Sequence, residues 1–235
     1  MIKAFKAVAL GLSLLLAGVS VCYAQDFQKG FAAYKAKDDK EAARLFGLAA
    51  AQGDEKAQYN LGVMYANSQG VAQDYKEAVR LYGLAAAQGH ASAQSNLGVM
   101  YANSQGVAQD YKEAVRLYGL AAAQGYVSAQ TNLGGMYANS QGVTQDNKEA
   151  IKWYRLAAEQ GNADAQYNLG WMYYIGLGIL QDNVYAYMWY NIAASGGDAN
   201  AVNERDVIAK KMTRSQLEKA QDLARECVKK NYKGC

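Results

Sequence analysis

Apolar residues recur along this chain with the spacing of one face of a helix. Ala78, Leu81 and Ala85 follow one another at intervals of three and four residues, as on an amphipathic helix, and Gly89 ends that pattern. A second apolar face runs through residues 93–101 and stops at an Asn-Ser-Gln-Gly turn. The pattern therefore predicts two helices joined as a hairpin.

This hairpin pattern repeats every 36 residues. The first helix of each copy begins at an Asp that is followed three residues later by a Glu, an arrangement in which the two side chains cap the first helical amides reciprocally. The four pairs are Asp38 and Glu41, Asp74 and Glu77, Asp110 and Glu113, and Asp146 and Glu149.

The period also predicts the organisation of the chain. Residues 25–39 form an N-terminal capping helix, the last helix begins at Thr213, which pairs with Gln216 in a capping arrangement, and residues 201–235 form a C-terminal cap. An isolated hairpin cannot bury its apolar face, so the copies are expected to stack into an all-α superhelix, a solenoid of 36-residue hairpins with a C-terminal capping helix. The copies are 40–75, 76–111, 112–147, 148–183 and a partial copy at 184–200.

Glycine interrupts the second helix of each copy, where it costs about 1 kcal/mol relative to Ala. A cost that recurs in every copy predicts that another backbone approaches at that position. Recurring alanines are expected to make room for tyrosine rings of the adjoining helix. The glycines are Gly62, Gly98, Gly134 and Gly170, and the tyrosines are Tyr65, Tyr101, Tyr137 and Tyr173.

Composition argues against catalysis. The chain has no proline, which favours helices joined by Gly and Asn turns, and its one histidine, His90, lies at a turn and is expected to be a solvated residue at a helix start. Residues 61–89 are identical to residues 97–125, and such repetition suits a binding surface better than a unique convergence of reacting groups. We expect no enzyme, no catalytic or metal-binding residue and no cofactor.

The first 24 residues have the pattern of a secretory signal peptide. Lys3 and Lys6 precede an apolar run, and small residues end at Ala24. Cleavage there predicts a periplasmic or secreted protein without an integral membrane segment; retention of the run as a membrane helix and lipidation of Cys22 are the alternatives. The remaining chain has 22 basic and 21 acidic residues, a balance that gives no reason to expect nucleic acid as a partner.

Two cysteines follow the repeats. Cys227 and Cys235 lie eight residues apart at the end of the chain, and in an oxidising compartment they are expected to form a disulfide bond. Two free thiols on a frayed tail are the alternative. The spacing matches no zinc or redox motif.

The repeated motifs resemble those of a known family. The pattern Ala-x-x-Leu/Trp-Tyr-x-x-Ala-Ala-x-x-Gly, then Ala-Gln-x-Asn-Leu-Gly-x-Met-Tyr, then Gly-Val-x-Gln-Asp, resembles the Sel-one-like repeat family, in its exported bacterial form, over residues 27 to about 200. The resemblance implies a tetratricopeptide-like, right-handed α-α superhelix (solenoid) that holds other proteins together. One departure is that Ser68, Ser104 and Ser140 stand where the family often has Gly, which only Gly176 keeps.

A second departure suggests where a partner binds. Family members usually place long polar side chains after the Leu/Trp-Tyr pair, whereas three copies here have Gly-Leu. If the first helix of each copy lines the concave side, as in tetratricopeptide relatives, a bare groove edged by positive charge results; the alternative is that duplication copied a neutral glycine. The candidate partner-binding residues are Lys76, Arg80, Gly83, Ala87, Lys112, Arg116, Gly119, Ala123, Lys148, Lys152 and Arg155.

Three functional hypotheses follow. The first is a non-enzymatic scaffold that binds another protein. The second is a module that binds cell-wall glycan or peptide, using the many tyrosines for stacking. The third is β-lactam binding or hydrolysis, as credited to cysteine-rich secreted relatives, but this chain lacks a cysteine pair in each repeat and has no Ser-x-x-Lys motif.

Overall fold

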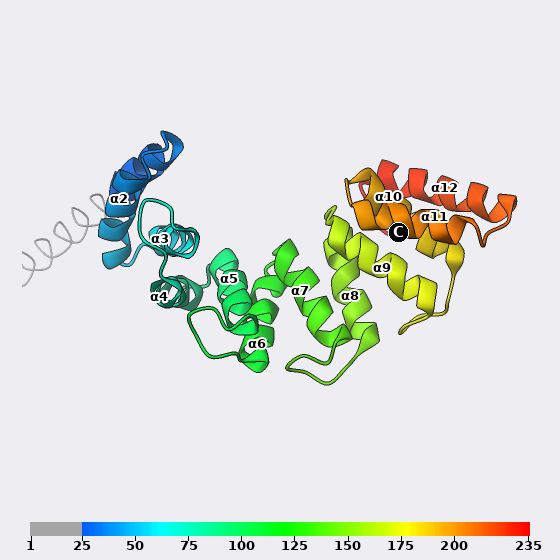
Figure 1. Ribbon diagram of the computed structural model, residues 1–235, viewed down its shortest axis with the longest axis horizontal. Helices are drawn as coiled ribbons and strands as arrows, with labels where there is room; N and C mark the ends of the chain where they lie inside the picture. The colour runs from blue at the N-terminus through cyan, green and yellow to red at the C-terminus, as the bar shows by residue number, and fades with distance from the viewer. Residues whose placement is uncertain (1–24) are drawn as a thin grey trace, which may run out of the picture. The chain divides into compact units, whose positions relative to one another are not determined.

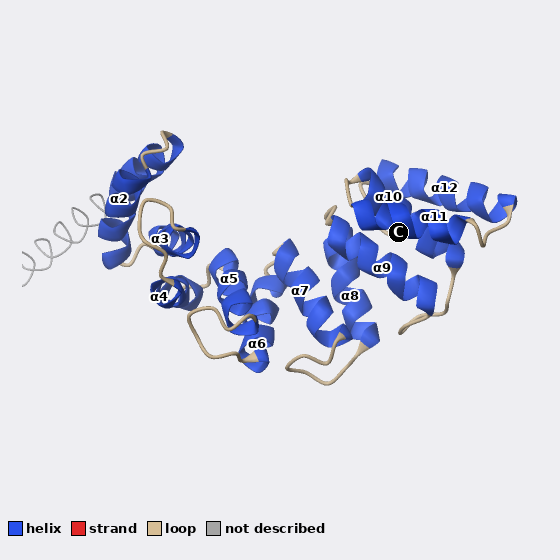
Figure 2. Ribbon diagram, in the orientation of Figure 1, coloured by secondary structure: helices blue, strands red, loops and turns tan. Residues whose placement is uncertain are grey.

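The computed structural model describes residues 25–235, and this part of the chain is helical throughout, without a strand (Figures 1 and 2). The proposed signal peptide lies outside the described residues. A first helix covers residues 25–35, and the labelled helices follow it. They are α2 (Asp39–Ala51), α3 (Glu55–Asn67), α4 (Tyr75–Ala87), α5 (Ala91–Ala102), α6 (Tyr111–Ala123), α7 (Val127–Ala138), α8 (Asn147–Ala158), α9 (Ala163–Ile175), α10 (Asn183–Ser195), α11 (Ala199–Ala209) and α12 (Arg214–Lys229).

The helices pack as hairpins in two compact units, one ending at Gln109 and the other beginning at Asp110. In the first unit α3 packs against both α2 and α4, and α4 against α5. In the second, each helix from α6 to α10 packs against the next, and α12 packs against α10. The all-α repeat fold predicted from the sequence is confirmed. Among the described residues, no helix is long and apolar enough to cross a membrane.

The aspartates cap their helices as predicted, but the glutamates do not reciprocate. The carboxylate of Asp74 accepts hydrogen bonds from the backbone N–H groups of Lys76 and Glu77, at 2.9 and 3.1 Å. The N–H of Asp74 already donates to the carbonyl of Tyr65, at 3.1 Å, so the Glu77 carboxylate instead pairs with Arg80. The reciprocal prediction was therefore wrong for these helices, whereas the Thr213–Gln216 capping box of α12 is confirmed.

The glycines inside α3, α7 and α9 make room for a ring rather than for a backbone. A Cβ atom added at Gly62 would lie 2.8 Å from the ring of Tyr82, and one added at Gly134 or Gly170 would lie equally close to Tyr154 or Tyr190. These rings come from the following helix, α4, α8 or α10. The prediction that a backbone approaches was wrong, because the tyrosine one hairpin onward fills that space.

A buried carboxamide joins consecutive helices in each copy. Gln58 on α3 is 4% exposed, and its Nε2 donates to the carbonyl of Ala50 on α2, at 3.2 Å. Its Oε1 accepts from Nε2 of Gln88, at 2.8 Å. Gln94, Gln130 and Gln166 likewise each donate to the carbonyl of the alanine eight residues earlier. The Gln of the Ala-Gln dipeptide thus donates a second hydrogen bond to a carbonyl at the end of the preceding helix, which a glycine N–H of the turn also reaches.

The turn after α3, α5, α7 and α9 has the same backbone conformation with Ser as with Gly. Ser68, Ser104 and Ser140 have φ of 58°, 57° and 55°, and Gly176 has φ of 74°. Each serine hydroxyl lies 3.3–3.4 Å from the carbonyl oxygen of the valine three residues later. This local hydrogen bond offsets part of the cost of a left-handed conformation in a residue that has a Cβ.

The C-terminal tail folds back onto the second unit. Cys227 and Cys235 form a disulfide bond with their Cα atoms 5.6 Å apart. The N–H of Gly234 donates to the Glu159 carboxylate, at 3.2 Å, and the ring of Tyr232 lies against Gly161. The disulfide therefore closes a short loop that contacts the turn between α8 and α9.

Candidate binding surfaces

The partner-binding residues predicted from the sequence lie on the outward face of the first helix of each copy. On α4, Lys76, Arg80 and Ala87 are exposed and Gly83 is half-buried, and the equivalent residues of α6 have the same exposure. On α8, Lys148 and Lys152 are exposed, whereas Arg155 is half-buried. The structure thus places the members of each set on one helix face.

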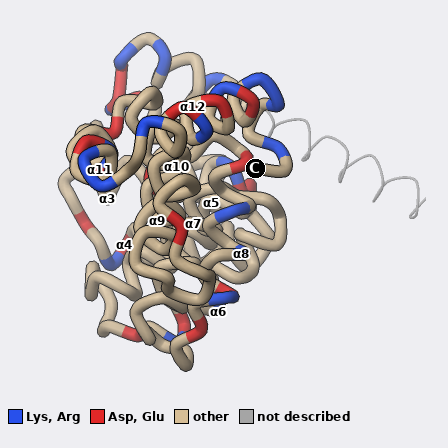
Figure 3. Tube along the Cα trace, turned by 90° about the vertical axis from the view of Figure 1, so that its right-hand side faces the viewer, with Lys and Arg blue, Asp and Glu red and all other residues tan. Residues whose placement is uncertain are grey.

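The positive charge of this face is largely compensated along each helix. Arg44, Arg80 and Arg116 each approach the glutamate three residues earlier to 2.6 Å, and Lys152 approaches Glu149 to 2.9 Å. In Figure 3 basic and acidic residues also alternate along α12. Exposed pairs of this kind contribute only about 0–1 kcal/mol each. Their effect here is to leave the face close to neutral rather than strongly basic.

Leucines make this face apolar. Leu48, Leu84, Leu120 and Leu156 are 40–44% exposed, although residues of this type are usually buried. A Cβ atom added at Gly47, Gly83 or Gly119 would meet no other atom within 4 Å. We call this set of glycines and leucines the Gly-Leu stripe, and each unit carries its own part of it: Gly47, Leu48, Gly83 and Leu84 in the first unit, and Gly119, Leu120 and Leu156 in the second.

The α8 helix departs from the stripe at Arg155. Its guanidinium donates to the hydroxyl of Tyr173 on α9, at 3.3 Å, which holds the side chain down against the neighbouring helix. Ile151, Leu156 and Glu159, with Lys148, Lys152 and Arg155, line a shallow hollow of about 360 Å³. Three of the residues predicted from the sequence therefore lie together in one depression.

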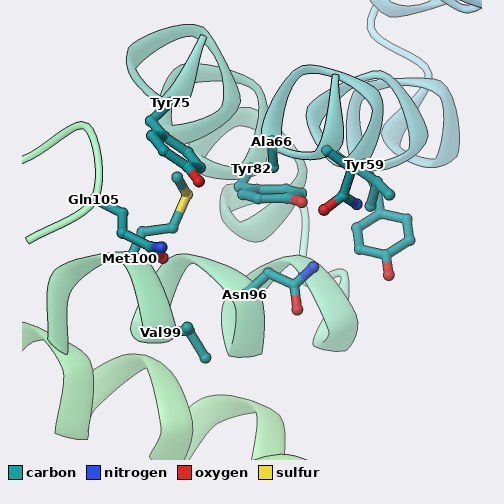
Figure 4. A pocket seen from close by; sticks show the side chains of 10 residues that line it. Tyr59, Ala66, Tyr75, Tyr82, Asn96, Val99, Met100 and Gln105 are labelled. Carbon is teal, nitrogen blue, oxygen red and sulfur yellow. The ribbon is translucent and has the colours of Figure 1, made fainter. Parts of the chain in front are cut away.

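A second feature, which the sequence did not predict, is a cleft between α3 and α5 in the first unit (Figure 4). It has a volume of about 300 Å³. The ring of Tyr82 lines it, and Asn96 points toward that ring from α5 (Figure 4). The lining residues are Tyr59, Val63, Ala66, Asn67, Tyr75, Tyr82, Asn96, Val99, Met100 and Gln105. We call it the first cleft.

A second cleft, of about 290 Å³, is built from equivalent positions in the second unit. Every lining residue except Tyr167 lies 72 residues, or two periods, after a lining residue of the first cleft. The lining residues are Ala138, Asn139, Tyr154, Tyr167, Asn168, Trp171 and Met172. The repeat thus forms the same kind of cleft twice, once within each unit.

Both clefts are lined by neutral groups. Burial raises the pKa of Tyr82 to about 12, an effect that a hydrogen bond with Asn96 opposes, and burial raises the pKa of Tyr154 to about 12. The pKa of Tyr167 is also raised, first by burial and then by the charges of Glu204 and Asp198. These hydroxyls therefore stay protonated at neutral pH and are available as hydrogen-bond donors and acceptors.

The histidine singled out from the sequence has a structural role at a helix start. His90 caps α5, its Nδ1 accepting from the N–H of Ala93 at 3.2 Å, and its ring stacks on Tyr59 with centroids 4.7 Å apart. It is half-buried rather than solvated as expected, because the tyrosine covers one of its faces. Within residues 25–235 no three His, Cys, Asp or Glu side chains gather as a metal site would require.

Comparison with known proteins agrees with this architecture. A model of the Sel1 repeat matches residues 23–54, 55–90, 91–126, 127–162 and 163–198. The chain belongs to the Sel1 repeat family. Each complete match begins at the helix that carries Leu-Gly and continues through the next helix, so that residues 55–90 contain α3 and α4.

Solved Sel1 repeat structures are similar over most of the chain. A Sel1 repeat protein from Oxalobacter formigenes is 30% identical, with a TM-score of 0.76 over 86% of this chain and 84% of that one. A Sel1 repeat protein from Klebsiella pneumoniae is 26% identical, with a TM-score of 0.52 over 80% of this chain and 93% of that one. The protective antigen c5321 of uropathogenic Escherichia coli is 26% identical, with a TM-score of 0.51 over 89% and 62% of the two chains. No curated protein gives a significant match.

Sel1 repeat proteins generally mediate protein–protein interactions, and solenoids of this family are typically non-catalytic scaffolds. In this Sel1 repeat protein the Gly-Leu stripe lies on α2 and α4 in the first unit and on α6 and α8 in the second, whereas the clefts lie between the helices that carry Leu-Gly. The Asn of each Ala-Gln-x-Asn-Leu-Gly motif was a signal in the sequence that could have pointed to the clefts, because it recurs at one position in every copy.

Proposed function

We infer that this Sel1 repeat protein is an exported, non-enzymatic scaffold that binds a partner protein along the Gly-Leu stripe. The observation that carries the inference is the exposure of Leu48, Leu84, Leu120 and Leu156 at the same position of four successive copies. Apolar side chains that recur at a solvent-facing position lose contact with water when a partner covers them, which favours binding.

The surface beside the leucines supports the same inference. The glycines leave open space next to the leucines of α2, α4 and α6, so the backbone of a partner can approach closely. The paired arginines and glutamates beside the stripe are suited to a partner with both charges or with none. A helix or an extended segment with a line of apolar residues fits such a surface.

Export is supported by the two ends of the chain. Residues 1–24 have the pattern of a signal peptide, and Cys227 and Cys235 form a bond that persists in oxidising compartments. We propose the periplasm or the extracellular medium as the location. Mass spectrometry of the protein from its native cell, fractionated into compartments, checks this: the expected species begins at Gln25 and carries no free thiol. An uncleaved or cytosolic species contradicts export.

The binding inference is tested by placing a photo-crosslinking amino acid at position 84 or 120 in the native cell. A protein captured at these positions is then purified and titrated with the full mature chain. Gly83→Arg combined with Gly119→Arg places two long charged side chains in the open space and is expected to weaken binding at least tenfold. Because those glycines have no neighbours, the melting temperature should be preserved.

A matched control uses solvent-facing positions away from the stripe. Lys56→Glu and Lys219→Glu change exposed charges on α3 and α12 and should leave binding of the captured partner unchanged. Equal weakening by the stripe and control variants contradicts docking on the Gly-Leu stripe. Unaltered binding by the double arginine variant removes the stripe from the explanation.

A further inference from the structure

The second cleft keeps the framework of the first. A tyrosine lines each of them, Tyr82 or Tyr154. In both clefts one wall carries an Ala-Asn pair, and the facing wall carries an Asn and a Met. In the second cleft the two asparagines are Asn139 on one wall and Asn168 on the other. A feature common to both clefts therefore belongs to the repeat, and only the differences between them point to a particular ligand.

The differences fall on opposite walls. Val63, which lines the first cleft, is replaced two periods later by Gly135, and a Cβ atom added there would lie 3.6 Å from the hydroxyl oxygen of Tyr154. Val99 on the facing wall is replaced by Trp171. One wall thus loses a side chain above the tyrosine hydroxyl while the other gains an indole ring.

Trp171 is 40% exposed, an uncommon position for so large an apolar surface on a helix that packs on both sides. Tyr167, one turn earlier on α9, stands where α5 has Ser95, so a second aromatic ring has been added to the same wall. Tyr167 packs on Tyr190 with ring centroids 5.3 Å apart, which fixes it in place. The wall formed by α9 therefore presents a supported aromatic surface to solvent.

The remaining groups define the chemistry of the ligand. No charged side chain lines the cleft, so a charged ligand would lose hydration without gaining a partner. The carboxamides of Asn139 and Asn168 each offer donors and an acceptor, and the hydroxyl of Tyr154 offers both. Aromatic surface combined with these neutral groups suits a ligand with a flat C–H face and polar groups around its edge.

We propose that the second cleft binds a neutral oligosaccharide that carries acetamido groups, with a sugar ring stacked on Trp171 and its polar groups paired with Asn139, Asn168 and Tyr154. The volume of about 290 Å³ lies just below the range usual for ligand sites, about 300–1,000 Å³, so it suits one or two rings of a longer chain.

A compact ligand explains the pattern of differences better than an extended peptide does. A peptide that crosses several repeats would meet each cleft in turn and would be served by identical clefts. Here the two clefts keep the same framework but differ on both walls, where the second has Gly135 and Trp171 in place of two valines. The proposal rests on α7, α8 and α9 and is independent of protein binding on the Gly-Leu stripe.

The proposal is tested with the full mature chain and the tetramer of β-1,4-linked N-acetylglucosamine, by titration calorimetry and tryptophan fluorescence. We expect saturable binding, with a change in emission that Trp171→Val abolishes. Trp171→Val and Gly135→Val each install the residue of the first cleft, which this same fold already accepts, and each should lower affinity at least tenfold. Val99→Ala, in the first cleft, is the matched control and should leave affinity unchanged.

Two further titrations separate the outcomes. The corresponding tetramer of glucose lacks acetamido groups and is expected to bind at least tenfold more weakly; equal binding overturns the assigned chemistry. Absence of saturable binding, binding that Trp171→Val leaves unaltered, or tighter Trp171-dependent binding of a neutral peptide of similar size overturns the site. Gly83→Arg with Gly119→Arg should not change sugar affinity, so failure of the stripe and failure of the cleft are distinguishable.

Discussion

The ring of Tyr154 on α8 lies so close to Gly134 on α7 that a Cβ atom on the glycine would approach it to 2.8 Å. This contact joins one hairpin to the next, and its equivalents join Gly62 to Tyr82 and Gly170 to Tyr190. Packing of a fixed ring onto a bare helix backbone is thus the repeated means by which the hairpins stack.

Replacing Gly134 by Ala should therefore destabilise the protein. The added methyl group clashes with a buried ring, at a cost of about 1–3 kcal/mol, which exceeds the gain of about 1 kcal/mol from the higher helix propensity of Ala. Gly83→Ala is the control, because it lies in a helix with no neighbour within 4 Å and should stabilise the protein. Urea unfolding followed by circular dichroism measures both. Equal effects of the two substitutions would contradict the packing role.

The buried glutamine should be needed for its hydrogen bonds rather than for its volume. Gln58→Leu keeps a side chain of similar size but removes the hydrogen bonds to the Ala50 carbonyl and from the Gln88 amide, two bonds that together contribute about 1–3 kcal/mol. Gln73→Ala removes the same kind of bond, to the carbonyl of Ala66, at an exposed site where water replaces it. The free energy of unfolding should fall clearly in the first variant and by less than about 0.5 kcal/mol in the second.

Stability should fall between pH 10 and 12 as buried tyrosines ionise. The pKa of Tyr154 is near 10 in the unfolded chain and is raised by burial to about 12 in the folded protein. The protonated Tyr154 hydroxyl therefore contributes fully to stability below pH 10, and this contribution is lost as the pH rises toward 12. The free energy of unfolding falls by about 2–3 kcal/mol over this range.

Tyr154→Phe isolates this contribution, because it keeps the ring and removes the titrating group. Between pH 10 and 12 the free energy of unfolding of the variant should fall by about 2–3 kcal/mol less than that of the unchanged protein. Urea unfolding at each pH measures this difference. Parallel curves for the two proteins would show that ionisation of Tyr154 is not coupled to unfolding.

His90 should be replaceable in part by Asn. His90→Ala removes both the cap to the Ala93 N–H and the stack on Tyr59, and should cost about 1–3 kcal/mol. Asn162 caps α9 at the equivalent position, accepting from Ala165 at 2.8 Å, so His90→Asn should restore the cap but not the stack and recover about 1 kcal/mol. Thermal unfolding of the two variants gives the comparison; identical melting temperatures would contradict a capping role.

Opening the C-terminal disulfide should destabilise the second unit. The bond closes a loop of nine residues, which on the chain-entropy model contributes about 2–3 kcal/mol. A reductant should lower the melting temperature of the unchanged protein and not that of the Cys227→Ser and Cys235→Ser double variant. If a reductant lowers the melting temperatures of both proteins equally, it does not act through the Cys227–Cys235 bond. Faster hydrogen exchange at Gly234 should accompany reduction, since its bond to Glu159 depends on the closed loop.

Local features could be predicted from the sequence because neighbours along the chain create them. The aspartate caps of Asp74 and Asp110, the capping box at Thr213 and the two-helix unit depend on residues within a few positions of one another. The sequence could not show that Glu77 fails to pair with the Asp74 amide, because the Tyr65 carbonyl that takes its place lies on the preceding helix. The sequence alone also predicted a face with Gly83 and Arg80 outward, but not that Glu77 would neutralise it.

By itself, the sequence determined the 36-residue unit, the positions at which its helices begin and the family to which the chain belongs, since each follows from periodic, short-range pattern. Only the tertiary structure decided which groups meet between hairpins. The ring beside Gly134, the open wall at Gly135 and the indole of Trp171 on the opposite side depend on how α7, α8 and α9 pack. Residues some twenty to forty positions apart share no local signal, and their side chains meet only when burial of the apolar faces fixes the orientation of each helix.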